Sequence, residues 1–242
     1  MKKKSLVFSL IFFLLQNILF AQIGGQTIFQ FLNFPASARI DAMGGTVNNI
    51  HDDDLNFGFQ NPALYSEEMN NRVSLSPVFY LADSKYGFVG YSHSFRKNSL
   101  KKIGSFGAGI QYLNYGKFTG TDNWGYITDT FSANDLAFIV GGSRQYNEKL
   151  SYGVNLKFIT SRYNIYTANA LAADIGGAYY DFRKEICIGF SLKNFGYEFN
   201  QFSSHNHEKL PFNIQAGISK KLKHTPFLFS LNLQHLEKFN IR

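Results

Sequence analysis

Most of this chain alternates between apolar and polar residues with a period of two, which is typical of β-strands with two different faces. We find no sustained 3.6-residue period of the kind that predicts an amphipathic helix. Each alternating segment is close to the roughly 9–11 residues that a tilted strand needs to cross a bilayer. The segments cover residues 72–80, 86–95, 103–113, 131–141, 150–160, 170–180, 185–195, 210–220 and 227–235. The pattern predicts an all-β fold of about nine antiparallel strands.

The polar face of these segments carries charges in mid-strand, at Asp135, Lys157, Asp174 and Lys193. A soluble β-sandwich tolerates such residues poorly in its core, whereas the wet interior of a membrane barrel accepts them. We therefore expect a transmembrane outer-membrane β-barrel, and a soluble sandwich remains the alternative.

The connections between the segments differ in length on the two sides of the predicted sheet. Those assigned to the inner side are short, and two on the other side, residues 114–130 and 196–209, are longer. Short periplasmic turns with longer outer loops are expected of an outer-membrane barrel. The connection at residues 81–85 is an exception, because it is a short one on the outer side.

The first long loop contains four aromatic residues that are candidates for docking a partner protein. Aromatic side chains dominate the energetics of protein interfaces. An equally good interpretation is that they form an aromatic belt or pack the loop on itself. The candidates are Tyr115, Phe118, Trp124 and Tyr126.

Residues 1–21 have the pattern of a secretory signal peptide. Three lysines are followed by an apolar run at residues 5–20 and by the small residue Ala21, which predicts Gln22 as the first mature residue. A membrane anchor is the alternative, but the run is shorter than the ~18–20 apolar residues of a spanning helix. The only cysteine, Cys187, excludes disulfides within the chain and is best interpreted as a small apolar filler.

Between the signal and the first strand, residues 22–71 are too polar and too interrupted by glycine and proline to form a membrane strand. Ser37 as an N-cap predicts one or two helical turns over residues 38–43, and Gly44-Gly45 ends them. We interpret residues 22–71 as a lead-in and a hatch that plugs the barrel, which itself spans residues 72–242.

Composition and charge add little beyond this. The chain has 26 Phe and 14 Tyr, yet its mean hydropathy is only −0.17, which fits strands with one apolar face. Of the net charge of +7, the signal peptide contributes three lysines, and the other basic residues lie mostly in turns. We interpret them as solvated turn ends and expect no nucleic-acid partner.

Signatures of catalysis or of metal binding are weak. There is no Gly-x-Ser-x-Gly elbow and no phosphate-binding loop. His205 and His207 are too few ligands for a metal, and the run Asp52-Asp53-Asp54 departs from the calcium-loop template. We expect no enzyme activity, no cofactor and no metal, and we assign the three acids to turn formation and hydrogen bonds with the wall.

The start of the mature chain has a Gly-Gly segment at residues 44–45, an acidic turn at residues 53–54 and an Asn-Pro-Ala motif at residues 61–63, all before the first strand. This combination resembles the FadL-like outer-membrane family, in which a hatch fills a barrel of fourteen strands. The resemblance is strong over residues 24–64 and extends beyond them only as a pattern. The family includes barrels of the type IX secretion system of Bacteroidetes. The sequences of residues 24–39 and 54–64 are similar to those barrels. The hatch motif consists of Gly44, Gly45, Asp53, Asp54, Asn61, Pro62 and Ala63.

This resemblance implies an outer-membrane protein that helps to hold exported cargo and its attachment complex at the cell surface. The implied partners are outer-membrane lipid and attachment proteins of the PorU, PorV and PorZ types. The alternative is a FadL-like channel for small hydrophobic compounds. Because fourteen strands are implied and about nine are visible, we expect this chain to be C-terminally truncated.

Overall fold

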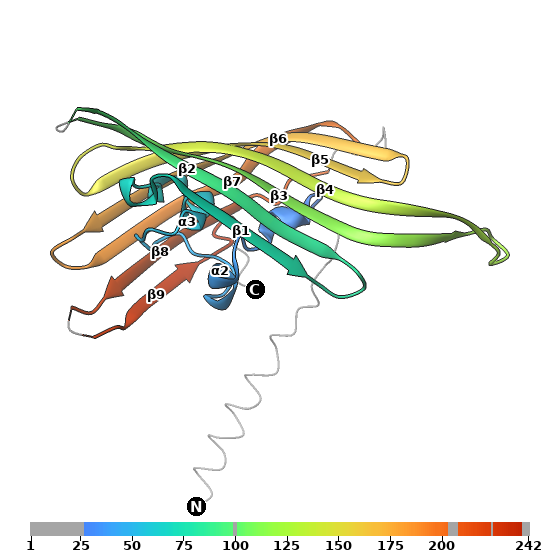
Figure 1. Cartoon of the computed structure of the whole chain (residues 1–242), viewed down its shortest axis with the longest axis horizontal. Helices are drawn as coiled ribbons and strands as arrows, with labels where there is room; N and C mark the ends of the chain where they lie inside the picture. Colours follow the sequence, from blue (N-terminus) through green and yellow to red (C-terminus); the bar gives the residue numbers. More distant parts are fainter. Residues whose placement is uncertain (1–26, 99–100, 203–207, 224, 239–242) are drawn as a thin grey trace, which may run out of the picture.

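In this computed structural model the described residues are 27–98, 101–202, 208–223 and 225–238, so the predicted signal peptide, His205 and His207 lie outside them. The described chain forms one nine-stranded antiparallel sheet in which each strand pairs with its neighbours in sequence (Figure 1). The strands are β1 (Arg72–Phe79), β2 (Lys85–Asn98), β3 (Lys101–Thr121), β4 (Ile127–Gln145), β5 (Leu150–Tyr163), β6 (Tyr166–Asp181), β7 (Ile186–Asn200), β8 (Asn213–Lys221) and β9 (Leu228–Leu233). This confirms the predicted all-β antiparallel fold.

The strands occupy the predicted segments, but several are longer than predicted. The largest difference is at residues 114–130, which are not a loop: β3 and β4 continue through them as a hairpin that extends past the other strands (Figure 1). Residues 196–200 likewise belong to β7. The Thr, Tyr and Ile residues of the first region favour extended backbone, and the polar residues among them concealed this in the sequence pattern.

The two faces of the sheet are the reverse of those in a soluble protein. In β5, Val154, Leu156 and Phe158 are 41–62% exposed, whereas Asn155 and Lys157 on the opposite face are at most 3% exposed. The other central strands repeat this arrangement, with most large apolar side chains outward and mainly small or polar ones inward. Ile139 and Ile159 are large apolar residues that face inward, where they belong to the buried clusters. The charges at Asp135, Lys157, Asp174 and Lys193 therefore all lie on the buried inner face.

The inner face is covered by a string of short helices, shown in blue and teal in Figure 1. We call residues 27–71, the described part of the segment before β1, the hatch. Its helical elements are η2 (Gln30–Asn33), α2 (Ala38–Ala42), α3 (Asn56–Gln60), η3 (Pro62–Leu64) and η4 (Glu67–Met69). None of the described helices is long and apolar enough to cross a membrane.

Helix α2 begins and ends as the sequence predicted. The Ser37 hydroxyl accepts a hydrogen bond from the Ile40 amide at 3.4 Å, and Gly44 and Gly45 follow the helix with φ of 95° and 77°. That left-handed backbone favours glycine. Helix α3 was not predicted, because Gly58 lies inside it. A Cβ at Gly58 would lie 2.2 Å from the Tyr65 ring, so the glycine serves close packing.

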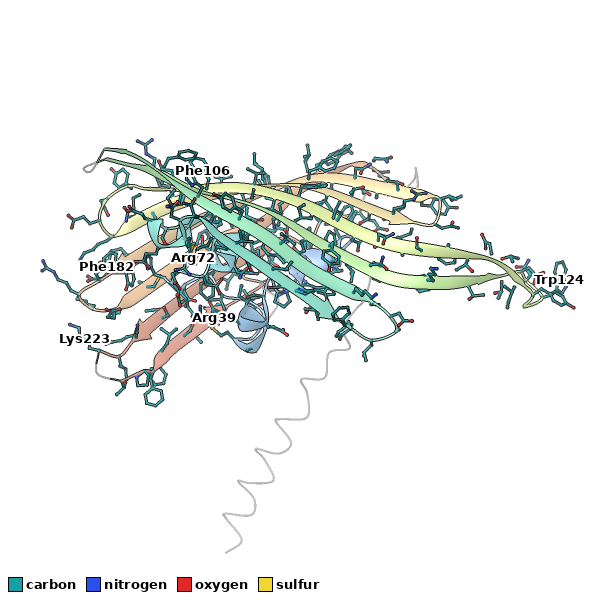
Figure 2. The ribbon with its side chains drawn as sticks, viewed as in Figure 1. Arg39, Arg72, Phe106, Trp124, Phe182 and Lys223 are labelled. Carbon is teal, nitrogen blue, oxygen red and sulfur yellow. The ribbon has the colours of Figure 1, made fainter. Side chains whose placement is uncertain are left out.

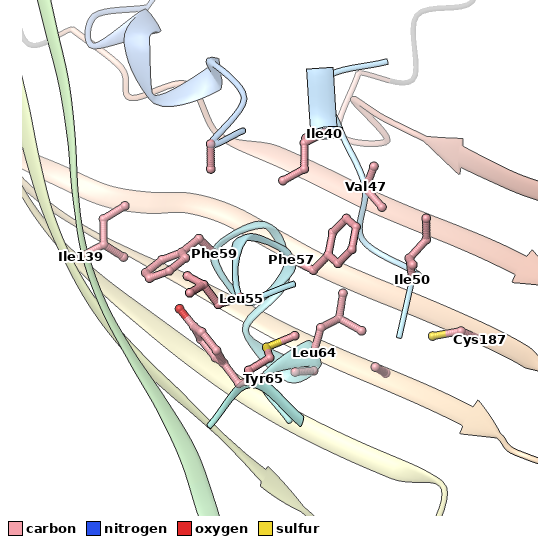
Figure 3. Packing of buried hydrophobic residues seen from close by; sticks show 14 of the residues in the cluster. Ile40, Val47, Ile50, Leu55, Phe57, Phe59, Leu64, Tyr65, Ile139 and Cys187 are labelled. Atoms are coloured by element: carbon pink, nitrogen blue, oxygen red, sulfur yellow. The ribbon is translucent and has the colours of Figure 1, made fainter. Parts of the chain in front are cut away.

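Two apolar clusters fix the hatch against the sheet. The first joins α3 and η3 to the wall and includes Cys187 as a buried filler (Figure 3). The second joins the start of the hatch to β3–β6, where Ile28 also donates its amide to the Lys209 carbonyl at 3.1 Å. The first cluster includes Leu55, Phe57, Phe59, Leu64, Tyr65 and Ile139, and the second includes Phe29, Phe31, Leu113, Ile159 and Leu210.

Glycines on the inner face let the hatch backbone approach the strands closely. A Cβ at Gly176 would lie 2.0 Å from Asn61 Oδ1, and one at Gly189 would lie 1.7 Å from the Asn48 carbonyl oxygen. Real Cβ atoms do not make contacts this short, so only glycine fits these positions while the hatch stays where it is. At Gly177, the next residue after Gly176, a Cβ would meet nothing within 4 Å.

We expect Gly176→Val to displace the hatch and to lower the free energy of unfolding by about 1–3 kcal/mol, the usual cost of overpacking. Gly177→Val is the matched control and is expected to leave stability nearly unchanged. Protease cleavage within the hatch measures its displacement, and denaturant unfolding of the full chain in detergent measures the change in the free energy of unfolding. Equal behaviour of the two variants would contradict the assignment.

Candidate functional site

Polar side chains of the sheet bind the backbone of the hatch. Ser143 donates to the Tyr65 carbonyl at 2.6 Å, Ser151 to the Ala63 carbonyl at 2.7 Å, and Gln111 to the Phe31 carbonyl at 2.8 Å. The helices of the hatch are three to five residues long and leave most of their carbonyls without an intrahelical partner. Wall side chains therefore supply the hydrogen bonds that buried backbone groups require. Ser92, Asn155 and Ser219 donate to the carbonyls of Met69, Gly58 and Asn49 in the same way.

The Asn-Pro-Ala part of the hatch motif connects the hatch to β6. Asn61 is fully buried, and its Nδ2 donates to the carbonyls of Asn48 at 2.8 Å and Gly177 at 3.3 Å. Its Oδ1 accepts from the Ala63 amide at 3.0 Å, and Pro62 begins η3. The motif therefore holds two parts of the hatch and the wall together through one amide side chain.

The acidic part of the motif forms ion pairs and a helix cap. Asp53 pairs with Arg72 of β1 at 2.6 Å. Asp54 accepts from the Asn56 amide at 3.0 Å at the start of α3, and Arg39 lies 2.5 Å from Asp52 and 3.4 Å from Asp54. The acids thus link α2, α3 and the first strand. Gly44 and Gly45 contact nothing that a Cβ would disturb, so their role is the left-handed turn after α2.

The ion pair with Arg39 affects the titration of Asp52. Burial raises the pKa of the Asp52 carboxyl, but hydrogen bonds with Asp53 and Arg39 outweigh burial and hold the pKa below its usual value. Because this pKa is lowered in the folded state, the ionised Asp52 carboxylate stabilises the fold, and the full effect is present above the ordinary pKa of an aspartate. It is lost as the pH falls through the lowered value.

Four of the mid-strand polar residues form one buried network beneath α3. Lys157 Nζ lies 2.8 Å from both Asp174 Oδ2 and Asn194 Oδ1. The backbone amide of Asn194 donates to Asp174 Oδ1, also at 2.8 Å. The adjacent Lys193 donates to Gln60 Oε1 in α3 at 2.9 Å. Asn194 has φ of 57°, and the β6–β7 register shifts beside Asp174, so an irregularity in the strands brings this network together.

At the end of the sheet where the short turns lie, the hatch leaves a mouth with two adjoining pockets of about 390 and 840 Å³. His51 stacks on Tyr180 with the ring centroids 4.3 Å apart, and both residues line both pockets. The smaller pocket combines the apolar side chains Phe95, Leu150 and Phe182 with carboxylates of the hatch. It is therefore a candidate site for a small amphipathic ligand.

The structure separates the four candidate docking aromatics. Tyr115 is half-buried on the inner side, where its hydroxyl donates to Asp135 Oδ2 at 2.7 Å, so it is not part of an external surface. Phe118 stacks on Phe131 across the hairpin, with the centroids 5.4 Å apart. Only Trp124 and Tyr126 lie at the tip between β3 and β4, where they are 82% and 72% exposed. Figure 2 shows Trp124 in this place.

The tip that carries Trp124 and Tyr126 is an ordered turn. Asp122 Oδ1 accepts hydrogen bonds from the amides of both aromatic residues at 2.9 Å, and Gly125 supplies a φ of 87°. The ribbon behind the tip has two unpaired edges, because β2 pairs with β3 only as far as Asn114 and β5 pairs with β4 only from Ala133. The hairpin thus presents a fixed aromatic pair and free strand edges together.

Within the described residues, no group of three or more His, Cys, Asp or Glu side chains is placed to hold a metal ion. No protein-family model matches the sequence, and the search of curated proteins finds no match. The family resemblance of residues 24–64 therefore remains a hypothesis, and the functional argument depends on the geometry of the sheet, hatch and hairpin.

We expect Lys157→Met to be strongly destabilising, by about 3–5 kcal/mol, because it leaves the Asp174 carboxylate buried without its cation. The double variant Lys157→Met/Asp174→Asn is expected to recover much of this loss, since no unpaired charge remains. Denaturant unfolding of the wild type, both single variants and the double variant gives the coupling energy. Additive effects in this cycle would show that the two side chains do not act as a pair.

Proposed function

We propose that this protein is an outer-membrane β-barrel of the type IX secretion system that helps to dock the attachment complex and exported cargo at the cell surface. The observation that carries the proposal is the β3–β4 hairpin, which projects an ordered aromatic tip from a sheet whose apolar face is outward.

The outward face supports a lipid environment. Large apolar side chains cover it from β1 to β9, including Leu75, Leu156 and Leu231, each more than 60% exposed. Soluble monomers rarely expose continuous apolar surfaces of this extent. The inner face is polar and filled by the hatch, as expected for a barrel interior.

Insertion requires the two edges of the sheet to be covered, because unpaired strand edges are not viable in lipid. β1 and β9 run in the same direction, since every pairing between them along the sheet is antiparallel. Closure by antiparallel pairs therefore takes an odd number of further strands. A barrel of fourteen strands, the number implied by the FadL-like resemblance, meets this condition.

The secretion role is supported by the resemblance of the hatch and by the hairpin. Residues 24–39 and 54–64 resemble PorQ, an outer-membrane protein of the type IX system. The free edges of the hairpin suit the addition of a partner strand, and Trp124 and Tyr126 provide aromatic anchors beside them. Partners of the PorU, PorV and PorZ types are the proposed occupants.

We expect Trp124→Ala/Tyr126→Ala to abolish co-purification of the attachment proteins with this barrel from cross-linked outer membranes. Each interface anchor of this kind contributes about 2 kcal/mol or more, so the double variant is expected to lose on the order of 1,000-fold in affinity. Mass spectrometry of the eluate and the amount of cargo at the cell surface measure the effect.

The matched control for the hairpin variant is Tyr146→Ala. Tyr146 is 76% exposed, as much as the tip aromatics, but lies in the β4–β5 turn at the opposite end of the sheet. It is expected to leave partner recovery unchanged. Undiminished recovery with the hairpin variant, or equal losses with both, would contradict docking at the tip.

The second candidate function, a FadL-like channel for small hydrophobic compounds, is favoured by one observation, the pocket of about 390 Å³ at the mouth. Around the hatch, many polar side chains of the inner face are hydrogen-bonded to the hatch backbone. This disfavours an apolar passage for hydrophobic compounds through the interior. We expect vesicles containing the full-length barrel to take up labelled fatty acid no faster than lipid-only vesicles. Faster uptake that a bulky substitution at Leu150 slows would favour the channel instead.

A further inference from the structure

The end of the sheet that carries the short turns has a basic rim. Its β4–β5, β6–β7 and β8–β9 turns and the adjoining strand ends contain seven described Lys or Arg residues but only three described carboxylates, those of Glu148, Asp181 and Glu185. We define the basic rim as the five exposed cations Arg144, Arg183, Lys184, Lys220 and Lys223. Of the other two cations, Lys149 pairs with Asp181, and Lys221 lines the mouth of the hatch.

No residue that the structure describes supplies a counter-charge to the five cations of the basic rim. None of them makes an ion pair or a side-chain hydrogen bond with any other residue that the structure describes. Two of the three acids at this end are engaged: Asp181 binds Lys149 at 2.7 Å, and Glu185 accepts from Tyr180 at 3.1 Å. The rim therefore presents free positive charge to its surroundings.

The basic rim adjoins exposed aromatic residues of the outward face. In the strand register Arg144 lies opposite Tyr152 and Lys220 lies opposite Phe229, and these aromatics are 49% and 63% exposed. Phe182, beside Arg183, is 54% exposed, and Figure 2 shows Phe182 and Lys223 at the end of the sheet far from Trp124. In membrane proteins, aromatic residues border the apolar band at the level of the lipid headgroups, and Lys and Arg side chains extend into the headgroup layer beside them.

We propose that the basic rim binds the phosphate groups of anionic phospholipids in the membrane leaflet on the turn side. This inference rests on the proposed insertion of the sheet into a bilayer. An acidic protein partner is the competing occupant. Lipid is favoured because Arg144 and Lys220 pair with outward-facing aromatics on the apolar face, whereas the mouth of the hatch faces the interior.

The test reconstitutes the full-length barrel in phosphatidylcholine bilayers that contain trace spin-labelled phosphatidylglycerol or phosphatidylcholine. Electron paramagnetic resonance then gives the motionally restricted fraction of each label. We expect the wild type to restrict phosphatidylglycerol more strongly, and about 1 M salt to remove this preference. Since one basic residue near an anionic surface strengthens association about fivefold, Lys184→Gln/Lys220→Gln/Lys223→Gln is expected to lower the relative association constant about fivefold or more.

The control variant Lys85→Gln/Lys117→Gln/Arg162→Gln removes three cations from the opposite end of the sheet and is expected to retain the preference. No restricted component with either label means no insertion, and then the membrane proposal and this inference fail together. Equal restriction of both labels, or a preference that the rim variant retains, overturns this inference alone. Binding of soluble polyglutamate to the wild type but not to the rim variant, without lipid preference, assigns the rim to an acidic protein and also overturns it.

Discussion

The hydrogen bonds between the wall and the hatch are the constraint on which the rest of this structure depends. A hatch built from very short helices carries many backbone groups with no local partner, and burying them unpaired would cost about 1–3 kcal/mol each. Serine, asparagine and glutamine side chains on the inner face provide those partners, as Ser143, Ser151 and Gln111 do. The polar inner face and the hatch are therefore two halves of one arrangement, and neither is favourable without the other.

The same requirement explains the small residues on the inner face. Wall hydroxyls and amides reach the hatch backbone only if the hatch lies directly on the strands, and Gly176 and Gly189 make room for that approach. It also fixes the strand register. A slip of one residue would turn the apolar face inward and remove every donor from the hatch. The buried pair of Lys157 and Asp174 adds to this specificity, because both charges are satisfied only in the observed register.

Because the hatch occupies the inner face, the proposed interactions with lipid and with partner proteins use the outward surfaces. These surfaces differ along the strands. The hairpin end carries an ordered aromatic tip, the middle is apolar, and the turn end is basic. Such a gradation suits a molecule that is held in a membrane while it presents one end to a partner. Charge at one end and aromatic anchors at the other give the two ends different chemistries, and each can be altered without disturbing the hatch.

The sequence by itself determined the strands, their number and their two faces, because a period of two follows directly from strand geometry. It also determined α2, whose cap and terminating glycines are local signals, and it identified the mid-strand charges as inward-facing. Only the tertiary structure decided what depends on contacts distant in sequence. Helix α3 contains a glycine because the Tyr65 ring packs directly against it. Tyr115 is not an external docking residue because its hydroxyl donates a hydrogen bond to Asp135, twenty residues away. The projection of the hairpin likewise depends on where the neighbouring strands end, and no local pattern encodes that.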